Sequence, residues 1–143
     1  MSPRASRNRL IGGSHALGHT EIDAEHFAIA NCWLEVTRCA PLALQFQIAR
    51  LRKLMRNHFD HEAMLVNAAG SPFCSCHKRE HEFLLSLCDK AYSLSRNNWR
   101  SARALLRGTL PGLVRQHIIS MDQIAVLIIN TAGDRTSVCP HGC

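Results

Sequence analysis

Apolar and polar positions alternate with helical spacing along most of this chain. In residues 21–39, apolar side chains recur every three or four positions, behind Thr20 as a candidate N-cap and with Asp23 three residues later. A second stretch starts at Pro41, whose missing N–H suits a first helical turn, and runs to about Asn67. The pattern predicts a helix over each stretch.

The second half of the chain carries the same signal. A third stretch spans about residues 73–95, and Asn97 and Asn98 interrupt it. A short helical piece at 100–106 precedes several turn-forming residues, and a fourth stretch covers 113–131. No segment alternates with period two for long enough to predict a strand. We therefore expect an all-α fold.

Helices of this length with mostly short connections favour an antiparallel four-helix bundle. A chain of 143 residues fits one domain. We expect the bundle to occupy residues 17–133, with a loosely held N-terminal arm at 1–16 and a cysteine-containing tail at 134–143. Four aromatic side chains are expected in the core, namely Phe27, Trp33, Phe59 and Phe83.

Composition favours a soluble globular protein, because 46% of the residues are hydrophobic and 20% are charged. The first residues are polar and Arg-rich and do not resemble an export signal. The longest apolar run, 124–129, is far shorter than the roughly 20 residues that span a bilayer. We expect a cytoplasmic protein that does not span a membrane.

The formal net charge of +6 raises the question of an anionic partner. The basic residues fall into three sets, in the N-terminal arm, at 50–56 and at 96–107. No nucleic-acid-binding motif accompanies them, and a basic stripe on a helix is usually a solvated face. The sequence therefore predicts neither nucleic acid nor membrane as a partner.

Seven cysteines are many for a chain of this length, but their number is odd and no export signal is visible. Cys32, Cys39 and Cys88 lie within helical patterns, where cysteine acts as a small buried hydrophobe. We expect reduced thiols. The alternative for two pairs is a functional role, either binding a soft metal or forming a redox couple. These pairs are Cys74 with Cys76 and Cys139 with Cys143.

Five histidines and two carboxylates of metal-binding types are spread over the four predicted helices. They are His26, His58, Glu62, His77, His81, His117 and Asp122. Two of the pairs are four residues apart, so each pair projects from one helix face. His117 and Asp122 are five apart, about 140° around an ideal helix. Both reach one centre only if it lies between their directions or a local π-bulge brings them together. We predict one polynuclear metal site in the bundle core.

Two polar neighbours of this set have alternative roles. Asp23, three residues before His26, either accepts a hydrogen bond from that imidazole or serves as a helix-start residue. His61 is next to Glu62 and is expected at the surface.

Four segments that carry these residues resemble, in order, the four motifs of the hemerythrin family. The segments are Ile22-Asp23-Ala24-Glu25-His26, His58-Phe59-Asp60-His61-Glu62, His77-Lys78-Arg79-Glu80-His81 and His117-Ile118-Ile119-Ser120-Met121-Asp122. The resemblance covers about residues 17–131 and is strongest to single-domain bacteriohemerythrins. It implies a four-helix bundle with two non-haem irons joined by an oxo or hydroxo bridge.

The resemblance also implies which residues hold each iron. His77, His81 and His117 would saturate the first iron, and His26 and His58 would bind the second. The second iron would keep an open position, where members of the family bind dioxygen reversibly.

In the same way, the carboxylates of Glu62 and Asp122 would bridge both irons. Reversible binding needs a dry pocket over the open position. By helical position we propose two apolar walls for it, Val114, which lies one turn before His117, and Ile118, which follows that histidine.

The leading function implied is a dioxygen carrier or store, which is not an enzyme and is expected to be a monomer, although weak oxidase or peroxidase side activity is compatible with the site. The first alternative is a sensor of oxygen, nitric oxide or redox state that signals through a separate protein partner. The second is an iron-handling protein or di-iron oxidase, which the absence of any Glu-x-x-His pair disfavours.

Overall fold

The computed structural model describes residues 16–132, and these residues form helices without any strand among them. The first three helices are α1 (Thr20–Arg38), α2 (Pro41–Ala68) and α3 (Ser75–Ser95). The remainder is a helical rod made of α4 (Trp99–Gly108), α5 (Leu110–His117), the π-helical turn η1 (Ile118–Asp122) and α6 (Gln123–Asn130). The expected all-α fold is confirmed for this part of the chain. The predicted arm and tail lie outside the described residues, except for Ala16.

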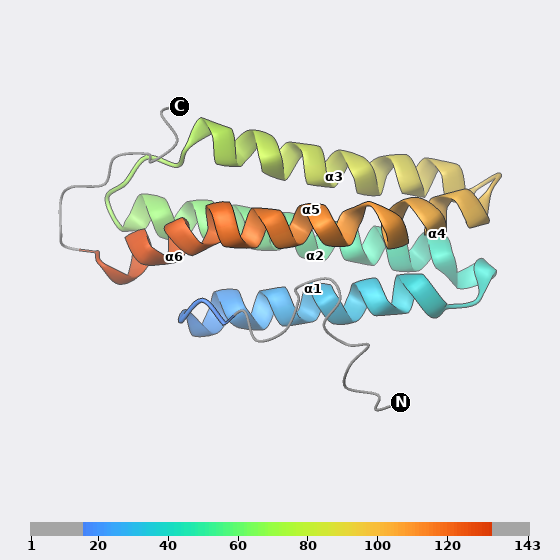
Figure 1. Cartoon of the computed structure of the whole chain (residues 1–143), viewed down its shortest axis with the longest axis horizontal. Coiled ribbons are helices and arrows are strands. Elements are labelled where there is room, and N and C mark those ends of the chain that lie inside the picture. Colours follow the sequence, from blue (N-terminus) through green and yellow to red (C-terminus); the bar gives the residue numbers. More distant parts are fainter. Residues whose placement is uncertain (1–15, 133–143) are drawn as a thin grey trace.

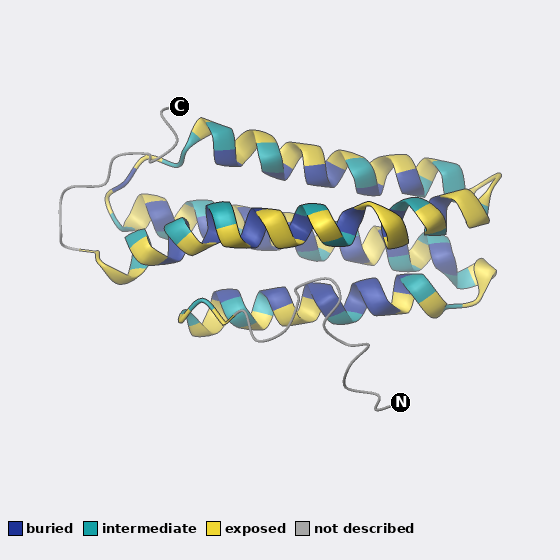
Figure 2. Cartoon of the chain, in the orientation of Figure 1, coloured by how far each residue is buried: buried dark blue, intermediate teal, exposed yellow. Residues whose placement is uncertain are grey.

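The four rods lie side by side along the long axis of the molecule, as a helical bundle (Figure 1). In Figure 1, α1 runs from left to right and α2 returns, then α3 runs to the right and the rod α4–α6 returns to the left. The α1–α2 and α3–α4 connections therefore lie at the same end of the bundle. We call this the connection end. Buried and exposed residues alternate along each helix, as expected for helices with one face in the core (Figure 2).

The start of α1 differs from the prediction by one residue. His19, rather than Thr20, is the N-cap, and its Nδ1 accepts a hydrogen bond from the backbone N–H of Ile22 at 3.3 Å. The Asp23 carboxylate accepts bonds from the backbone N–H groups of Leu17 at 2.8 Å and Gly18 at 3.2 Å. Asp23 is thus a helix-start residue and does not bond to the His26 imidazole. The chain entering α1 is fixed by these bonds, which orients the first turns of the helix.

The predicted short helix at 100–106 is confirmed as α4, but the break after it is the single residue Thr109, and the next helix begins at Leu110 rather than at 113. Thr109 has helical dihedral angles, φ −97° and ψ −45°, and its N–H donates to Leu105 O at 3.0 Å. Pro111 lies in the first turn of α5, where its missing N–H leaves no helical bond unmade. The turn-forming residues therefore fail to interrupt the rod.

Two of the four expected core aromatics are buried and two are not. Trp33 and Phe59 are buried, and the Trp33 indole N–H donates to Leu106 O at 2.9 Å, joining α1 to α4. Phe27 and Phe83 are 63% and 52% exposed, so their predicted core positions are wrong. Phe27 directly follows an inward-facing residue and Phe83 is two positions after another. At 100° per residue, both rotations carry the ring out of the buried stripe.

One helical stretch among the described residues, Trp99–Asn130, is long and apolar enough to cross a membrane by length and composition alone. A core helix of a globular bundle meets the same criterion. Here the stretch contributes two polar side chains, His117 and Asp122, that are 2% and 1% exposed and contact side chains from the other helices. These contacts assign the stretch to the core of the bundle.

Candidate metal centre

The structure brings all seven predicted metal-binding side chains together in the interior of the bundle. α1 contributes one, α2 and α3 contribute two each, and the rod α4–α6 contributes the last two. Every one of them is at most 5% exposed. They are His26, His58, Glu62, His77, His81, His117 and Asp122. So dense a set of buried ionisable groups is costly without a compensating charge.

Their ligand atoms fall into two groups that could each hold a metal ion. One consists of His77, His81, His117 and Asp122, and the other of His26, His58 and Asp122. Within each group the potential ligand atoms lie within 4.8 Å of one another. Asp122 belongs to both groups, so its carboxylate is at the middle of the centre.

Each carboxylate turns one oxygen towards each histidine group. Asp122 Oδ1 lies 2.8 Å from His117 Nε2, and Oδ2 lies 2.9 Å from His26 Nε2. Glu62 Oε1 lies 2.9 Å from His77 Nε2, and Oε2 lies 3.5 Å from His58 Nε2. This is the disposition that a carboxylate needs to bridge two cations.

His117 and Asp122 reach the same centre because the helix changes its winding between them. The five residues Ile118–Asp122 form a π-helical turn. The wider turn brings side chains five positions apart onto one face, whereas an α-helix separates them by about 140°. Of the two geometries that the sequence left open, the structure has the π-bulge.

The short distances between imidazole nitrogens indicate that a cation fits this site. His81 Nε2 lies 3.1 Å from His117 Nε2, and His77 Nε2 lies 3.2 Å from the same atom. A neutral imidazole has one N–H, so three such nitrogens cannot all satisfy one another by hydrogen bonding. Both oxygens of Glu62 are buried and accept no hydrogen bond from the described residues, since His77 Nε2 is close but off the line of a bond. Cations between these atoms would satisfy them.

In the metal-free protein, burial and the neighbouring charged groups shift the pKa values of the histidines in opposite directions. Burial disfavours the charged form of His58, but the carboxylates of Asp122 and Glu25 overcome it and raise its pKa to about 10. The balance raises the pKa of His77 to about 9, through Asp122 and Glu62. Burial and the neighbouring imidazoles instead lower the pKa of His81 to about 2.

The two central carboxylates are shifted in opposite directions. Burial and the charge of Asp122 raise the pKa of Glu62. Burial opposes ionisation of Asp122 too, but the imidazoles of His117, His26 and His58 hold its pKa well below the ordinary value. Without metal, one carboxylate is therefore favoured as a neutral acid and the other as an anion that pairs with imidazolium groups.

Loading a divalent metal at pH 7 is expected to release at least about two protons per chain, because the raised pKa values of His58 and His77 keep both imidazoles protonated in the metal-free protein. The raised pKa values of His117 and Glu62 favour their protonated forms as well and add to the release. Metal ligation needs neutral imidazole, so protons compete with metal below these pKa values. The apparent affinity for Zn²⁺ or Fe²⁺ should therefore fall as the pH falls from 9 to 6. A pH indicator in weak buffer measures the release, and a pH-independent affinity would contradict the expectation.

Two residues that the sequence analysis missed orient ligand imidazoles. Glu25 Oε2 lies 2.8 Å from His58 Nδ1, and Glu80 Oε2 lies 2.7 Å from His117 Nδ1. A carboxylate on Nδ1 leaves Nε2 free to face the centre and makes it a more basic ligand. The signal available in the sequence is that each glutamate directly precedes a ligand histidine, His26 or His81. Each thereby reaches a histidine of the neighbouring helix.

His61 lies outside the metal-binding set, as expected, but it is not isolated from it. Its Nδ1 is bonded to Glu25 Oε1, and its Nε2 lies 3.3 Å from Glu21 Oε2. Burial opposes ionisation of Glu25, but hydrogen bonds from His58 and His61 lower its pKa. His61 therefore helps to hold the glutamate that orients His58.

An apolar cavity adjoins the second histidine group. The cavity is small, with room for one water-sized molecule. The structure places both proposed pocket residues, Val114 and Ile118, in its wall. The other lining residues are His26, Ile29, Met55, His58, Phe59, Leu84, His117 and Asp122. Apart from the metal-binding side chains, the wall is entirely apolar.

The cysteines are not part of this centre. Cys32 and Cys88 are buried and free, as expected, and burial raises their pKa values to about 11 and about 12. Cys39 and Cys74 are also free and only partly buried. Cys76 is disulfide-bonded, so the expectation of reduced thiols is wrong for this residue. The tail pair, Cys139 and Cys143, lies outside the described residues.

Comparisons with known proteins found no matching family model, no matching curated protein and no matching solved structure. The resemblance to hemerythrins therefore rests on the motifs in the sequence. The structure adds two buried groups of histidine and carboxylate side chains that could hold metal ions.

Proposed function

We propose that this chain is a hemerythrin-like protein, an antiparallel four-helix bundle that binds dioxygen reversibly at a di-iron centre. The observation that carries the proposal is the placing of the two carboxylates. Asp122 and Glu62 each turn one oxygen towards both histidine groups, as bridging ligands between two ions do. Histidine and carboxylate together suit iron. The proposed protein is a cytoplasmic monomer that acts as a carrier or store rather than as an enzyme.

The unequal numbers of imidazoles support an open position at one ion. Three histidines, His77, His81 and His117, face the first ion, whereas His26 and His58 face the second. The apolar cavity is lined by both histidines of the second group and by His117 of the first, which supports an open position on the side of the ion with fewer imidazoles.

Two reduced irons would supply the electrons that bind dioxygen, and the chain would control what else reaches them. The apolar wall of the cavity would keep out water and proton donors, whose access would let dioxygen take two electrons from the irons and leave as hydrogen peroxide. Glu25 and Glu80 hold the imidazoles of His58 and His117 in place while the charge of the centre changes.

Metal analysis combined with optical spectra tests this function. Purified under reducing, anaerobic conditions and loaded with Fe²⁺, the chain should hold two irons and be nearly colourless. Air should produce an oxo-bridge and ligand-to-metal absorption that disappears again on removal of oxygen. One zinc per chain, or iron that oxidises without reversal, would contradict the proposal.

Replacing Val114 with aspartate should leave two irons bound but speed autoxidation by an order of magnitude or more. Val114 is buried in the cavity wall and contributes no ligand, so the substitution introduces water and a proton donor beside the open position. The decay of the oxygenated spectrum measures the rate. Val114→Ile keeps the wall apolar and is the matched control; equal rates for both variants would show that this wall does not protect the irons.

A redox sensor is the alternative that one observation favours. Cys76 is disulfide-bonded and directly precedes the metal-binding His77, so its redox state acts one residue from the centre. Under this alternative, reducing the disulfide should shift the optical spectrum of the iron-loaded protein. An unchanged spectrum would favour the carrier.

A further inference from the structure

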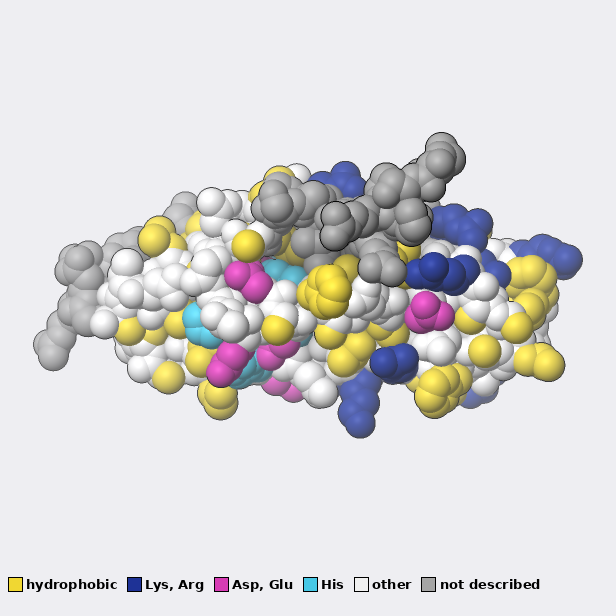
Figure 3. All heavy atoms as spheres, turned by 90° about the horizontal axis from the view of Figure 1, so that it is seen from below, with side chains coloured by type: hydrophobic (Ala, Val, Ile, Leu, Met, Phe, Trp, Pro, Cys, Tyr) yellow, Lys and Arg dark blue, Asp and Glu magenta, His cyan; other side chains and the backbone are white. Residues whose placement is uncertain are grey.

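Among the described residues, most of the positive charge is concentrated at one end of the bundle. Two basic sets that are about 45 residues apart in the sequence meet there, because the α1–α2 and α3–α4 connections share the connection end (Figure 1). In the view of Figure 3, Lys and Arg side chains gather in the right half, whereas most Asp, Glu and His side chains lie in the left half. The basic residues of this end are Arg38, Arg50, Arg52, Lys53, Lys90, Arg96, Arg100, Arg103 and Arg107.

Few acidic groups neutralise this end. Arg52 pairs with Asp89, and Arg38 lies 3.6 Å from Glu35, and these two acids are the nearby carboxylates among the described residues. Arg103 donates to the backbone carbonyl of Cys39, at the C-terminal end of α1. That contact stabilises the end of α1 but leaves the positive charge in place.

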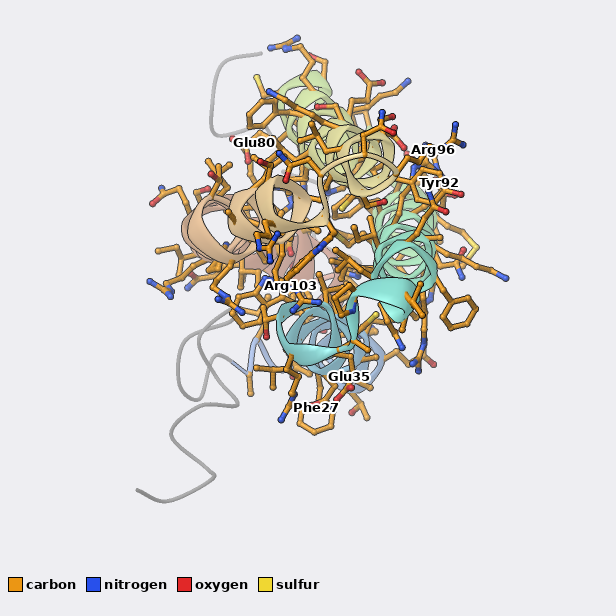
Figure 4. All side chains as sticks on the ribbon, turned by 90° about the vertical axis from the view of Figure 1, so that its right-hand side faces the viewer. Phe27, Glu35, Glu80, Tyr92, Arg96 and Arg103 are labelled. Atoms are coloured by element: carbon orange, nitrogen blue, oxygen red, sulfur yellow. The ribbon has the colours of Figure 1, made fainter. Side chains whose placement is uncertain are left out.

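The connection end also bears a shallow groove suited to an anion. The groove, about 450 Å³, is lined by Trp99, Arg100, Arg103 and Arg107, together with Ala104 and Gly108. The guanidinium groups of Arg100 and Arg103 lie 4.6 Å and 5.2 Å from the Trp99 ring centroid. The buried Nε of Arg103 has no hydrogen-bond partner among the described residues. Figure 4, which looks onto this end, shows Arg103 well inside the outline of the bundle and Arg96 at its edge.

Two large apolar side chains stand out of the same end. Leu42, in the first turn of α2, is 100% exposed, and Phe46, one turn later, is 69% exposed. Residues four apart share a helix face, and that face continues into the exposed Arg50 and Lys53. Protruding apolar side chains beside cations are typical of surfaces that enter the headgroup region of a bilayer.

We propose that the connection end docks onto the surface of a membrane rich in anionic phospholipid. The arginines would bind lipid phosphates, and Leu42 and Phe46 would insert among the acyl chains. A nucleic acid would match the charge, but it offers no apolar medium for a fully exposed leucine, and the Trp99 ring is covered by two arginines rather than open to base stacking. This proposal departs from the sequence-based expectation that membrane is not a partner.

Docking would leave the metal centre clear of the bilayer. His58 follows Phe46 by 12 residues along α2, which is about 18 Å at 1.5 Å per residue. The proposal rests on charge and exposure alone, so it does not depend on which metal the centre holds. Its failure and the failure of the di-iron proposal are therefore separable.

Co-sedimentation of the full chain with vesicles tests the proposal. Phosphatidylcholine vesicles with 30 mol% phosphatidylglycerol should retain the protein at low salt, and pure phosphatidylcholine should not. Arg96→Glu combined with Arg100→Glu should weaken partitioning at least about tenfold, because each basic residue near an anionic surface contributes attraction that reversal turns into repulsion. Leu42→Ser combined with Phe46→Ser should weaken it severalfold in a way that added salt does not mimic.

The matched control is Lys78→Glu combined with Arg79→Glu, which makes the same change in net charge on two exposed residues of the opposite half. It should retain most vesicle binding, and metal content and helicity should be unchanged in all variants. Equal losses in the control and the Arg96/Arg100 variant would overturn the proposed location. Tighter binding to double-stranded DNA than to the anionic vesicles at physiological salt would overturn the choice of membrane.

Discussion

Replacing Asp122 with asparagine is expected to remove both metal ions, not one. Asp122 is the member that the two groups share, with Oδ1 beside His77 and His117 and Oδ2 beside His26. The amide keeps the shape of the side chain but carries no charge, and its nitrogen is not a ligand. We expect the affinity for each ion to fall at least about 100-fold, more than the 10- to 100-fold typical of losing an outer hydrogen-bond partner.

The measurement is metal content after dialysis, with competition against a chelator for the affinities. Asp60→Asn is the control, since this exposed aspartate lies on α2 between two ligands without belonging to either group. Loss of one ion with normal retention of the other would show that Asp122 serves a single ion and that Glu62 alone spans the pair.

Stripping the metal from the protein is expected to lower its melting temperature by about 10 °C or more. An ion present at 1,000 times its dissociation constant stabilises the native state by about 4 kcal/mol. For a chain of this size, 1 kcal/mol corresponds to roughly 2–4 °C or slightly more. Removal also leaves Glu62, which has no exposed surface, without its positive counter-charge. Thermal unfolding with and without chelator measures the effect, and coincident curves would exclude a metal that contributes to folding.

The variant Glu62→Gln separates this explanation from general damage to the core. Glutamine imitates the protonated acid that the raised pKa of Glu62 favours in the metal-free protein. The substitution should therefore lower the melting temperature of the metal-loaded protein while leaving the metal-free protein unchanged or more stable. A similar loss in both forms would mean that Glu62 matters for packing and not for the metal.

The sequence predicts the site better than it predicts the ends of the rods, for a physical reason. Two of the candidate pairs have the four-residue spacing of one helix face, and the single misfit, between His117 and Asp122, left a π-bulge as one of two geometries, which the structure has. Pro111, by contrast, is compatible both with a turn and with the first turn of a helix. Which of these occurs depends on packing against other helices, which local sequence does not encode.

Features that depend on the arrangement of the bundle escape the sequence. Glu25 and Glu80 each bond to a histidine of a different helix, and a sequence shows neither the partner nor the direction. In the sequence, the basic sets at 50–56 and 96–107 are two separate solvated faces. Only the fold shows that they lie at the same end of the bundle (Figure 1). Phe27 and Phe83 are hydrophobic enough to predict core positions, but their angles on the helix relative to His26 and His81 turn both rings outward.

The π-helical turn makes the rod that contains it sensitive to length. One extra residue per turn rotates everything after Asp122 by about 100° relative to an uninterrupted α-helix. The inward positions of Ala125 and Val126 are therefore set by the same insertion that aims the carboxylate. Shortening Ile118–Met121 by a single residue would turn the Asp122 carboxylate away from the histidines and displace the last two turns of α6 at the same time. A deletion there would therefore damage the buried histidine cluster and the end of the bundle together.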